Sequence, residues 1–571
     1  MQSHSPPNSS SLSLLSSKLF DDHYGDVSRI EELKRSYHRA RAIGQLHRLT
    51  IEDVLHLAPK FWAVHKDSII ARDPIAHILV TIQLNLVVGT MAPFAIKRPD
   101  LHPLMESILN FDISTPFMLT EVGHGCDARN LKTTATLQHD GSFILHTPTP
   151  EAVKFMPPSM PIDGIRRVAI VWARLIVDEE DRGIRAFIVP VNNGKEMNKG
   201  VHSWLLPQIT GGRMLDHGLT SFDNVHLPAN AMLGELAMPA DMRTQFLSAI
   251  HRVGIGALAL SLAIIPSLKC ATYCVGRYSQ RRTVQAGVRG ERIPIISFRT
   301  QQLPILHSLA QIAVMEAFAD WITNRYTTDS ALHPGAKHGL GVILKATFLQ
   351  NGQWSLANLV ERSGAQGLYP HNQMVSFETL TRGIGIAEGE ILVLSIRLAT
   401  ELLVGQYAIP EPTKPNCPLA QHETGIISEL RDKLKQIGTH RSDEYGNQVL
   451  PRLRSMVIAI GQRMAYEAAV DAHVDPDLLA LYEAGVMKSD AAWYSENLGI
   501  NRDAQFQLEC NALDAVLRRL DEHLDNLEIE PYCTAPMLSP DRWMRIIKAA
   551  PEFTGNVEMG FPGAQELQSK L

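Results

Sequence analysis

FMLTEVGHGCDARNLKTTATL, residues 117 to 137, is the stretch from which the organisation of the whole chain can be worked out. An apolar strand, Phe117 to Leu119, leads to Thr120 and Glu121, and the loop Gly123-His124-Gly125 follows. A hydroxyl at a strand end, beside two glycines that let backbone N–H groups come close, suits a flat polar heterocycle with a phosphate tail. An ordinary strand–loop–strand connection has the same local pattern, so the rest of the chain must separate the two interpretations.

The composition is typical of a large globular protein. The chain has 571 residues, enough for roughly three or four domains. Hydrophobic residues make up 45% and charged residues 20%, and the net charge is −6. With this weakly acidic balance we expect no nucleic acid and no anionic membrane as a partner.

The cysteines are sparse and form no CxxC pair: Cys126, Cys270, Cys274, Cys417, Cys510 and Cys533. This spacing indicates a reducing intracellular compartment, with neither a zinc site nor a disulfide framework. Cys270 and Cys274 are four residues apart in a predicted helix and therefore share a face. We interpret them as a packed core pair rather than a metal site.

Both ends of the chain carry distinctive sequences. Residues 1–19 are rich in Ser and Pro, which predicts a disordered tail rather than a targeting leader. The last three residues, Ser569-Lys570-Leu571, are the tripeptide read by the peroxisomal import receptor. Glycines in the preceding segment favour a flexible tail that presents this signal. We therefore expect a peroxisomal protein that has the import receptor as a partner.

Two apolar stretches are candidates for membrane insertion. Pro74 to Ile96 carries no charge but contains several polar side chains and an internal proline, and Val253 to Ile265 is short and followed by Pro266. Both favour buried helices, so no membrane span is predicted. Within the second stretch, a dinucleotide-like GxGxxA pattern starts at Gly254. No strand precedes it, and we interpret it as a small-residue helix face for close packing.

Hydrophobic periodicity predicts an α+β fold that is mainly α. Apolar residues recur at helical spacing on both sides of a central region of β-branched and aromatic runs. The predicted parts are an N-terminal helical domain at 20–116, a β-barrel-like domain at 117–237, a helical bundle at 238–406, a proline-rich linker at 407–418, a second C-terminal helical domain at 419–552 and a flexible tail at 553–571. In the last helical domain a leucine stripe is more typical of a bundle core than of a cofactor site, and it could also serve as a subunit contact: Leu513, Leu517, Leu520, Leu524 and Leu527.

A second group of glycines surrounds Glu388, just before a long apolar helix: Gly383, Gly385 and Gly389. A carboxylate in such a close-approach loop has little access to water, which raises its pKa and its strength as a base. The alternative is that Glu388 only caps or charges the first turn of the helix at 391–404. Glu390 is the nearest rival for the role of base, and Glu361 and Glu378 are weaker ones.

Both glycine-containing patches resemble the acyl-CoA oxidase and acyl-CoA dehydrogenase family. The 117–137 stretch resembles the flavin-binding stretch of that family, and ERSGAQGLYPHNQ, 361–373, resembles its glycine-rich turn, which helps bind the flavin nucleotide tail, commonly across a dimer interface. Glu388 stands where the family has its catalytic glutamate. With both patches in the family's order, we assign Glu388 as the base. The order helical, β, helical, helical is similar to the layout of the oxidases, whereas the dehydrogenases generally lack the fourth part.

The resemblance implies FAD as the cofactor and an acyl-CoA as the substrate. The residues that it implies for FAD are Thr120, Gly123, Gly125, Pro158, Arg277, Gly364, Gln366 and Gly367. Those that it implies for the substrate are Cys126 and Gly389, and no metal is expected.

Three positions depart from the family pattern. Cys126 stands where the family usually has Ser. Residues 155–159, FMPPS, replace a Trp-Trp-Pro-Gly-Gly run, so that Pro158 lacks the N–H of a glycine. Ala387 stands where an aromatic residue normally precedes the base, which predicts a wider pocket near the reacting carbons.

The implied reaction is α,β-desaturation of an acyl-CoA. Glu388 would remove the α-proton, flavin N5 would take the β-hydride, and O₂ would reoxidise the flavin to give hydrogen peroxide. We also expect a homodimer. Two other interpretations stay open: a family dehydrogenase or desaturase acting on a specialised, polyketide-type acyl thioester, and a catalytically silent flavin-fold partner subunit.

Overall fold

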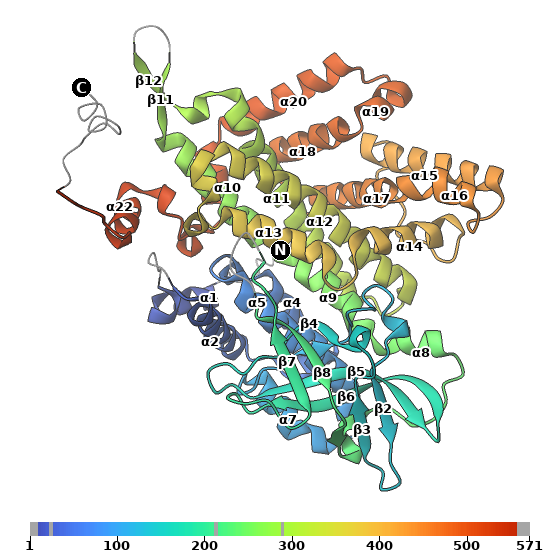
Figure 1. The fold of residues 1–571 in the computed structure, drawn as a ribbon. Helices are drawn as coiled ribbons and strands as arrows, with labels where there is room; N and C mark the ends of the chain where they lie inside the picture. The colour runs from blue at the N-terminus through green and yellow to red at the C-terminus, as the bar shows by residue number, and fades with distance from the viewer. Residues whose placement is uncertain (1–8, 22–26, 210–214, 287–289, 557–571) are drawn as a thin grey trace, which may run out of the picture.

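The computed structural model describes residues 9–21, 27–209, 215–286 and 290–556. Along the chain, a β-domain separates an N-terminal group of helices from a large group of helices in the second half. In Figure 1 the N-terminal helices and the β-domain lie in the lower part of the molecule and the large helical group in the upper part. The predicted fold class, α+β and mainly α with a central β-domain, is confirmed. The targeting tripeptide and the end of the predicted flexible tail lie outside the described residues.

The N-terminal part is helical. It consists of α1 (Ser9–Leu12), α2 (Arg29–His47), α3 (Ile51–Leu55), α4 (Pro59–Lys66), α5 (Pro74–Thr81), the π-helix η4 (Ile82–Val88), α6 (Gly89–Ala95) and α7 (His102–Leu109), with short 3₁₀ turns at η1 (Ser13–Ser16), η2 (Lys18–Phe20), η3 (Ser68–Ala71) and η5 (Pro99–Leu101).

The prediction of a disordered tail over 1–19 is wrong for its described part, residues 9–19. Short helices occupy residues 9–20, and the buried Ser11 hydroxyl donates to Asp67 Oδ1 at 2.6 Å. Phe20 is buried and packs in the main core. Local composition suggested disorder, but burial of Phe20 against α2 and η3 provides the apolar contacts that order this segment.

The β-domain is built from two sheets. One has the order β10 (Met232–Leu233), β6 (Glu180–Asn192), β5 (Arg167–Val177), β2 (Thr134–Leu137), β3 (Phe143–His146), β9 (Val225–Leu227), with β1 (Phe117–Met118) paired to β5. The other has the order β4 (Lys154–Pro158), β8 (His217–Phe222), β7 (Val201–Leu205). Short 3₁₀ turns η6 (Ala128–Asn130), η7 (Pro150–Ala152) and η8 (Ala229–Ala231) connect strands. Apolar side chains from both sheets, among them Val171 and Phe222, share one buried core.

Turn residues with a left-handed backbone connect neighbouring strands and set their registers. Gly141 has φ 84° in the connection between β2 and β3. Asp178 and Glu179, in the charged turn between β5 and β6, have φ 49° and 66°. Two consecutive left-handed residues match the right-handed twist of a two-residue hairpin.

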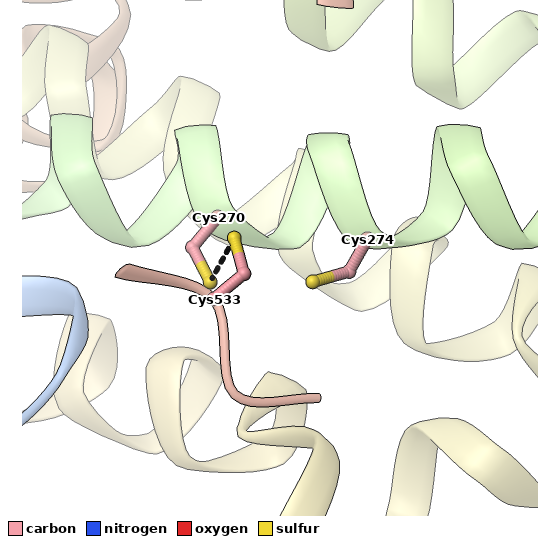
Figure 2. Close-up of side chains that lie close together, drawn as sticks. All are labelled: Cys270, Cys274 and Cys533. Atoms are coloured by element: carbon pink, nitrogen blue, oxygen red, sulfur yellow. Dashed lines mark hydrogen bonds between the residues drawn. The ribbon is translucent and has the colours of Figure 1, made fainter. Parts of the chain in front are cut away.

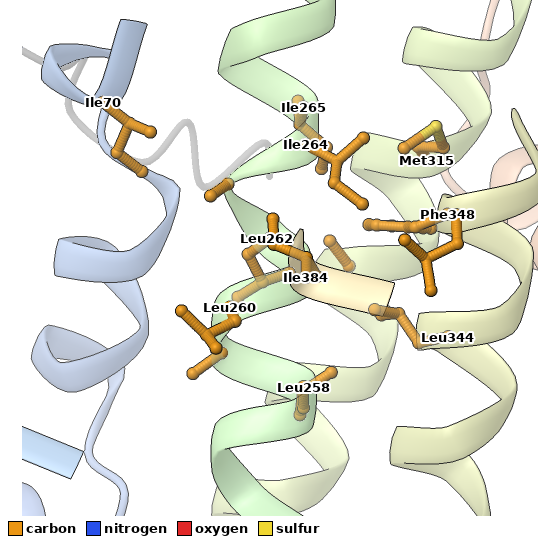
Figure 3. Packing of buried hydrophobic residues seen from close by; sticks show 14 of the residues in the cluster. Ile70, Leu258, Leu260, Leu262, Ile264, Ile265, Met315, Leu344, Phe348 and Ile384 are labelled. Atoms are coloured by element: carbon orange, nitrogen blue, oxygen red, sulfur yellow. The ribbon is translucent and has the colours of Figure 1, made fainter. Parts of the chain in front are cut away.

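The central helical bundle follows. Its helices are α8 (Met242–Ala249), α9 (His251–Leu262), α10 (Ile264–Arg281), α11 (Arg299–Thr328), α12 (Pro334–Arg362), α13 (Met374–Ile386) and α14 (Ile391–Leu403), with 3₁₀ turns η9 (Ile295–Ser297), η10 (Gly364–Leu368) and η11 (Pro370–Asn372). Side chains of α9, α10, α11, α12 and α13 interdigitate in the core, as Leu258, Ile264 and Phe348 illustrate (Figure 3). A hairpin of β11 (Thr283–Ala286) and β12 (Glu291–Pro294) interrupts the helices, although the sequence predicted only helices here.

The C-terminal helices start after an irregular segment that runs through the proline-rich region. They are α15 (Pro418–Ile437), α16 (Asp443–Gln448), α17 (Leu450–Asp471), α18 (Pro476–Ser489), α19 (Ala491–Leu498), α20 (Arg502–Leu517), α21 (Leu520–Asp525) and α22 (Pro540–Ala549), with η12 (Glu530–Tyr532) and η13 (Pro536–Leu538). Four of the five stripe leucines are buried and Leu517 is partly buried, so the stripe forms bundle core.

Three helical segments of the described chain are long and apolar enough to cross a membrane: Pro74–Ala95, Met242–Arg281 and Arg299–Thr328. Their most apolar windows are 89%, 78% and 67% buried inside the folded chain. The sequence argument that Pro266 ends the second segment is wrong, because Pro266 lies in the first turn of α10, where proline is tolerated. The expectation of no membrane span stays a prediction.

Candidate active site

Glu388 lies in the short loop between α13 and α14, in a strained backbone conformation. Its φ is 55°, in the left-handed region that non-glycine residues rarely adopt, and Gly389 follows with φ 93°. Such strain persists only where surrounding contacts enforce it, and it is concentrated at functional sites. Gly389, which we predicted to contact the substrate, is therefore needed to form the backbone turn of the loop.

The carboxyl group of Glu388 is shielded from water and incompletely paired. Its Oε2 is buried and has no hydrogen-bond partner among the described residues. It lies against Gly256 of α9, where a Cβ atom on that glycine would come within 1.4 Å of Oε2. Burial raises the pKa of Glu388 to about 8, against an opposing effect of Lys345. The GxGxxA segment is thus a close-packing helix face, as predicted, and the group packed on Gly256 is this carboxyl.

Lys345 of α12 supports the loop, and sequence reasoning missed it. The side chain is fully buried, and its Nζ donates to Ala387 O at 2.6 Å and to Gly389 O at 2.8 Å. Burial lowers the pKa of Lys345 to about 8, against the charges of Glu388 and Glu390. One charged residue within the apolar run GLGVILKATFL, 339–349, was the available signal. Buried lysines need partners, and here the partners are the carbonyls that flank the base.

Glu390 has the capping role that was the alternative for Glu388. Its carboxylate oxygens accept from Leu392 N and Val393 N, each at 3.0 Å, at the N-terminus of α14. The weaker rivals are also engaged, since Glu378 pairs with Arg382 at 2.9 Å and Glu361 with Arg362 at 3.3 Å. Glu388 is therefore the carboxylate in this group with a buried oxygen that has no partner.

A cavity of about 930 Å³ opens beside the Glu388 loop, between the N-terminal helices, the β-domain and α13. Ala387 lines it from the loop, Leu260 from α9 and Met156 from β4. The rest of its wall is largely apolar, with Ile75, Phe377 and Ile384 among the contributors. Ala387 thus faces open space, as the absence of the expected aromatic ring predicts, and Met156 borders the same space.

Thr120 and β4 come together next to Met156, which lines the cavity from the β-domain. Thr120 Oγ1 donates to Phe155 O at 3.0 Å, and Phe155 N donates to Thr120 O at 3.1 Å. The next residue, Met156, has φ 77°, and the pairing of β4 with β8 shifts register between Phe155 and Pro158. The TEVGHG loop and the FMPPS run, separate in sequence, therefore form one irregular, strained edge.

Gly123, Gly125 and Cys126 of that loop lie at the surface. Gly123 N donates to Glu151 O at 2.9 Å, and a Cβ at this position would approach Glu151 Cβ at 2.9 Å. Gly125 has no heavy atom within 4 Å of a Cβ position, so it is open to a ligand. Cys126 is exposed. Exposed positions of this kind let a ligand approach the backbone closely, but they do not indicate which ligand binds.

Two residues assigned to the cofactor have structural partners of their own. Pro158 is buried, and its carbonyl accepts from Arg167 Nη1 at 2.6 Å. Arg277 Nη1 pairs with Asp521 Oδ1 at 2.5 Å, and its Nη2 pairs with Asp525. Two carboxylates neutralise the guanidinium that was expected to meet a phosphate, so its contact with a cofactor stays a prediction.

The glycine-rich turn at 364–367 forms η10, away from the Glu388 loop. Gly364 has φ 60° and nothing within 4 Å of a Cβ position, whereas a Cβ at Gly367 would clash with Val360 O at 2.3 Å. Gln366 is held by Asn372, whose Nδ2 donates to its backbone carbonyl at 2.9 Å and to its side-chain oxygen at 3.0 Å. The next residue, Leu368, is 66% exposed. The turn therefore presents glycine backbone and an apolar side chain at the surface.

The structure brings the two halves of the predicted site to one cavity through their neighbours, Ala387 and Met156. The predicted site residues themselves, Glu388 and Thr120 as well as Arg277 and the 364–367 turn, are not among the described residues that line that cavity. A second cavity of about 450 Å³, between the start of α11, α12, α17, α18 and α20, is lined by none of the predicted residues.

Comparison with known proteins identifies the class of this architecture. No protein-family model matches the chain. Acyl-CoA oxidase 1 of Yarrowia lipolytica has the same fold, with a TM-score of 0.80, 18% sequence identity and coverage of 98% of this chain and 91% of that one. Acyl-CoA oxidase-1 of Caenorhabditis elegans, crystallised with FAD and ATP, gives a TM-score of 0.69 at 17% identity over 100% and 99% of the two chains. At such identities the likeness establishes the fold.

Curated sequences give the same family. A probable acyl-coenzyme A oxidase of Caenorhabditis elegans is 24% identical over 385 residues, 62% of this chain and 56% of that protein. The peroxisomal acyl-coenzyme A oxidase 2 of Arabidopsis thaliana is 23% identical over 418 residues, 68% of this chain and 60% of that protein. The matches thus span less than two thirds of the length of these relatives. In sequence and in fold, the chain is therefore similar to acyl-CoA oxidases.

Proposed function

We propose that this chain is a flavin-dependent acyl-CoA oxidase that desaturates an acyl thioester between its α and β carbons. One observation carries the proposal. Glu388 is a strained, desolvated carboxyl with an unpaired oxygen, beside a largely apolar cavity of about 930 Å³ that the flavin-side edge of the β-domain also lines. Removing a proton next to a thioester carbonyl needs such a base, because a hydrated carboxylate of ordinary pKa is too weak.

The residues at the cavity fit a flavin in part. Thr120 and the irregular edge of β4, next to Met156 of the cavity wall, provide a hydroxyl and a distorted backbone. Outside the cavity lining, Gly125 and Gly364 leave room for close approach at the surface. FAD, when bound, would accept the β-hydrogen with two electrons and pass the electrons to O₂, giving hydrogen peroxide. Support for FAD comes from the Caenorhabditis elegans relative, which was crystallised with it. Pro158 contributes no N–H there, so that family contact is not expected in this chain.

The protein's own part in the reaction is proton transfer and positioning. Glu388 takes the α-proton in its ionised form, and Gly256, which has no side chain, leaves the space against α9 that the carboxyl occupies. Lys345 fixes the carbonyls on either side of Glu388, so the carboxyl keeps one orientation toward the reacting carbon. Apolar walls keep water from the base and from the substrate.

Localisation and assembly belong to the same proposal. Several relatives are named as peroxisomal acyl-CoA oxidases, and the terminal Ser-Lys-Leu sequence has the form of the peroxisomal signal. We propose import through the receptor that reads this signal, and a homodimer in which the surface turn at 364–367 meets the nucleotide tail of a cofactor bound by the other subunit. The acyl-CoA oxidase relatives do not favour a dehydrogenase or a silent partner subunit.

An absorbance experiment tests the proposed function. Purified protein should show the flavin absorbance spectrum, and the visible band should bleach when an acyl-CoA is added without oxygen. Readmission of air should restore the band and release hydrogen peroxide, one per acyl-CoA consumed. Protein that binds no flavin would contradict the proposal, and bleaching with slow reoxidation and no peroxide would indicate a dehydrogenase.

A further inference from the structure

Three cysteine thiols from two distant segments meet in the interior, outside the candidate active site (Figure 2). Cys270 and Cys274 lie one turn apart on α10, and Cys533 follows η12, 263 residues after Cys270. All three side chains are buried, with exposed fractions of 1%, 1% and 2%. The sequence predicted a packed pair on α10, and the third thiol is what the fold adds.

The spacing of the sulfur atoms fits a common metal ion. The Sγ atoms of Cys270 and Cys533 are 3.5 Å apart, and all three Sγ atoms lie within 4.8 Å of one another. Three thiolates around one ion at a metal–sulfur distance of about 2.3 Å are separated by about 4.0 Å in a trigonal plane. Small shifts of three side chains would therefore complete the geometry. Figure 2 shows the three side chains directed into the same space.

The donor set selects a soft ion that accepts three ligands. Thiolates favour Cu(I), Zn²⁺ and iron–sulfur clusters. Zn²⁺ almost always takes four ligands in a structural site. The described residues offer three suitable ligand atoms here, and none of the three is exposed to water. Monovalent copper satisfies both conditions, because three thiolates complete its coordination without a fourth ligand.

Charge around the cluster also matches monovalent copper. The guanidinium groups of Arg72 and Arg542 both act electrostatically on Cys270, and Arg542 Nη1 donates to Cys533 O at 2.9 Å. Three thiolates with Cu(I) carry a net charge of −2, which two guanidinium groups balance.

We propose that Cys270, Cys274 and Cys533 form a trigonal thiolate site for Cu(I), which fastens the C-terminal segment at 530–538 to α10. The consequence reaches the cavity, because Thr534 follows Cys533 and lines that cavity together with Gln373. Thr534 Oγ1 donates to Gln373 Oε1 at 2.6 Å, and Met537 N donates to Asn372 Oδ1 at 3.0 Å. A metal at the thiols would hold this part of the cavity wall in place.

Copper titration of the full-length, reduced protein tests the site. Under anaerobic conditions, Cu(I) offered from a chromophoric competing ligand should bind at one ion per chain. X-ray absorption of the loaded protein should show three sulfur neighbours at about 2.3 Å. Cys270→Ser, Cys274→Ser and Cys533→Ser should each weaken binding at least about tenfold, because even outer-shell changes cost that much. Cys126→Ser and Cys510→Ser, outside the cluster, are the matched controls and should leave binding unchanged.

Several results would overturn the proposal. These are no Cu(I) bound in excess of the Cys270→Ser, Cys274→Ser and Cys533→Ser variants, fewer than three sulfur neighbours, a four-coordinate Zn²⁺ that Cu(I) does not displace, or a Cys270–Cys533 disulfide in protein kept reduced throughout. If a serine variant fails to fold, the sulfur count in the unmodified protein still decides. The test does not depend on flavin or on acyl-CoA, so its outcome is independent of the proposed oxidation.

Discussion

Two buried glutamate–lysine combinations in this chain have opposite chemistry. In the β-domain, Glu121 accepts hydrogen bonds from Lys132 N at 2.7 Å, from Thr133 N at 2.9 Å, from Thr133 Oγ1 at 2.6 Å and from Lys154 Nζ at 3.0 Å. In the helical bundle, Glu388 has an unpaired Oε2, and Lys345 donates to the neighbouring carbonyls instead. Burial alone would raise the pKa of both glutamates. The charge of Lys154 and the hydrogen bonds outweigh burial at Glu121 and hold its pKa below the usual value, whereas burial dominates at Glu388.

The difference shows that hydrogen-bond saturation, rather than burial, decides whether such a carboxyl is structural or reactive. Glu121 has both oxygens engaged, so it fixes the strand end that positions Thr120 and is unavailable to a substrate. Glu388 keeps a free oxygen and a raised pKa, which are the properties of a general base. Lys345 holds the backbone on both sides of Glu388 by hydrogen bonds and forms no direct ion pair with its carboxyl.

The largest expected effect is on catalysis, at Glu388, whose carboxyl has an oxygen without a hydrogen-bond partner. Glu388→Gln keeps the shape of the side chain but cannot take a proton, so the rate of flavin bleaching by acyl-CoA should fall by about 10²–10⁴-fold. Stopped-flow absorbance measures this directly. Glu390→Gln is the matched control, because Glu390 caps α14 and should change stability by about 0.5–2 kcal/mol with little effect on rate. Normal bleaching by Glu388→Gln would place the base elsewhere.

At Glu121, whose two carboxyl oxygens both accept hydrogen bonds, a substitution should lower the free energy of unfolding. Glu121→Gln leaves the buried Lys154 ammonium without its counter-charge, which should cost about 3–5 kcal/mol. A lower urea midpoint, read from the fluorescence of the buried Trp172 region, measures the loss. Glu151→Gln, at an exposed position nearby, should stay within about 0.5 kcal/mol of the parent. Equal stability of the two variants would mean that the Glu121–Lys154 pair has no net structural role.

A smaller change tests the packing under Glu388. Gly256→Ala puts a methyl group where the carboxyl lies, so the side chain must move from its present position. We expect a loss of about 1–3 kcal/mol from overpacking and at least about a tenfold slower bleaching rate. Gly446→Ala, in α16 with nothing within 4 Å of the new Cβ, is the control and should be neutral or stabilising. Unchanged bleaching by Gly256→Ala would show that this orientation of Glu388 is not the reactive one.

The smallest expected effect is a displaced pH profile. Glu388 must be ionised to act, so the bleaching rate should rise with pH through about 8, as a property of the coupled Glu388–Lys345 pair. Lys345→Met removes the positive charge that lowers the pKa of Glu388, so this limb should move to higher pH. A rate profile of both proteins between pH 6 and about 10 measures the shift. A limb that moves to lower pH, or a flat profile in the parent, would contradict this account.

The free energy of unfolding should also depend on pH through Glu388 and Lys345, and the two residues should act in opposite directions. The pKa of Glu388 is raised on folding, so its contribution is present below the ordinary glutamate pKa and is lost as pH rises through about 8. The pKa of Lys345 is lowered on folding, so its contribution is present above the ordinary lysine pKa and is lost as pH falls through about 8. Together they predict a local minimum of stability near that pH.

The sequence by itself determined the elements and the location of the loop that carries the candidate base. Alternation and β-branched runs predicted the strands, helical spacing predicted the bundles, and Gly389 lies in the tight loop predicted before α14. Gly383 and Gly385, predicted to belong to that loop, lie in α13 instead, because their helical backbone hydrogen bonds continue to Ile386. These are local signals, since backbone preferences and amphipathic periods act over a few residues. Where a local signal was misleading, as for the tail at 9–19, distant apolar contacts outweighed composition.

Only the tertiary structure decided which side chains the loop meets. Lys345 lies 43 residues before Glu388 and Gly256 lies 132 before it, and Cys533 joins Cys270 across 263 residues. No period or composition shift in the sequence marks such pairs, because each partner looks locally like an ordinary residue of its helix. Their chemistry arises from desolvation and from which lone pairs are left unpaired. Those properties exist only after helices from different parts of the chain have packed together.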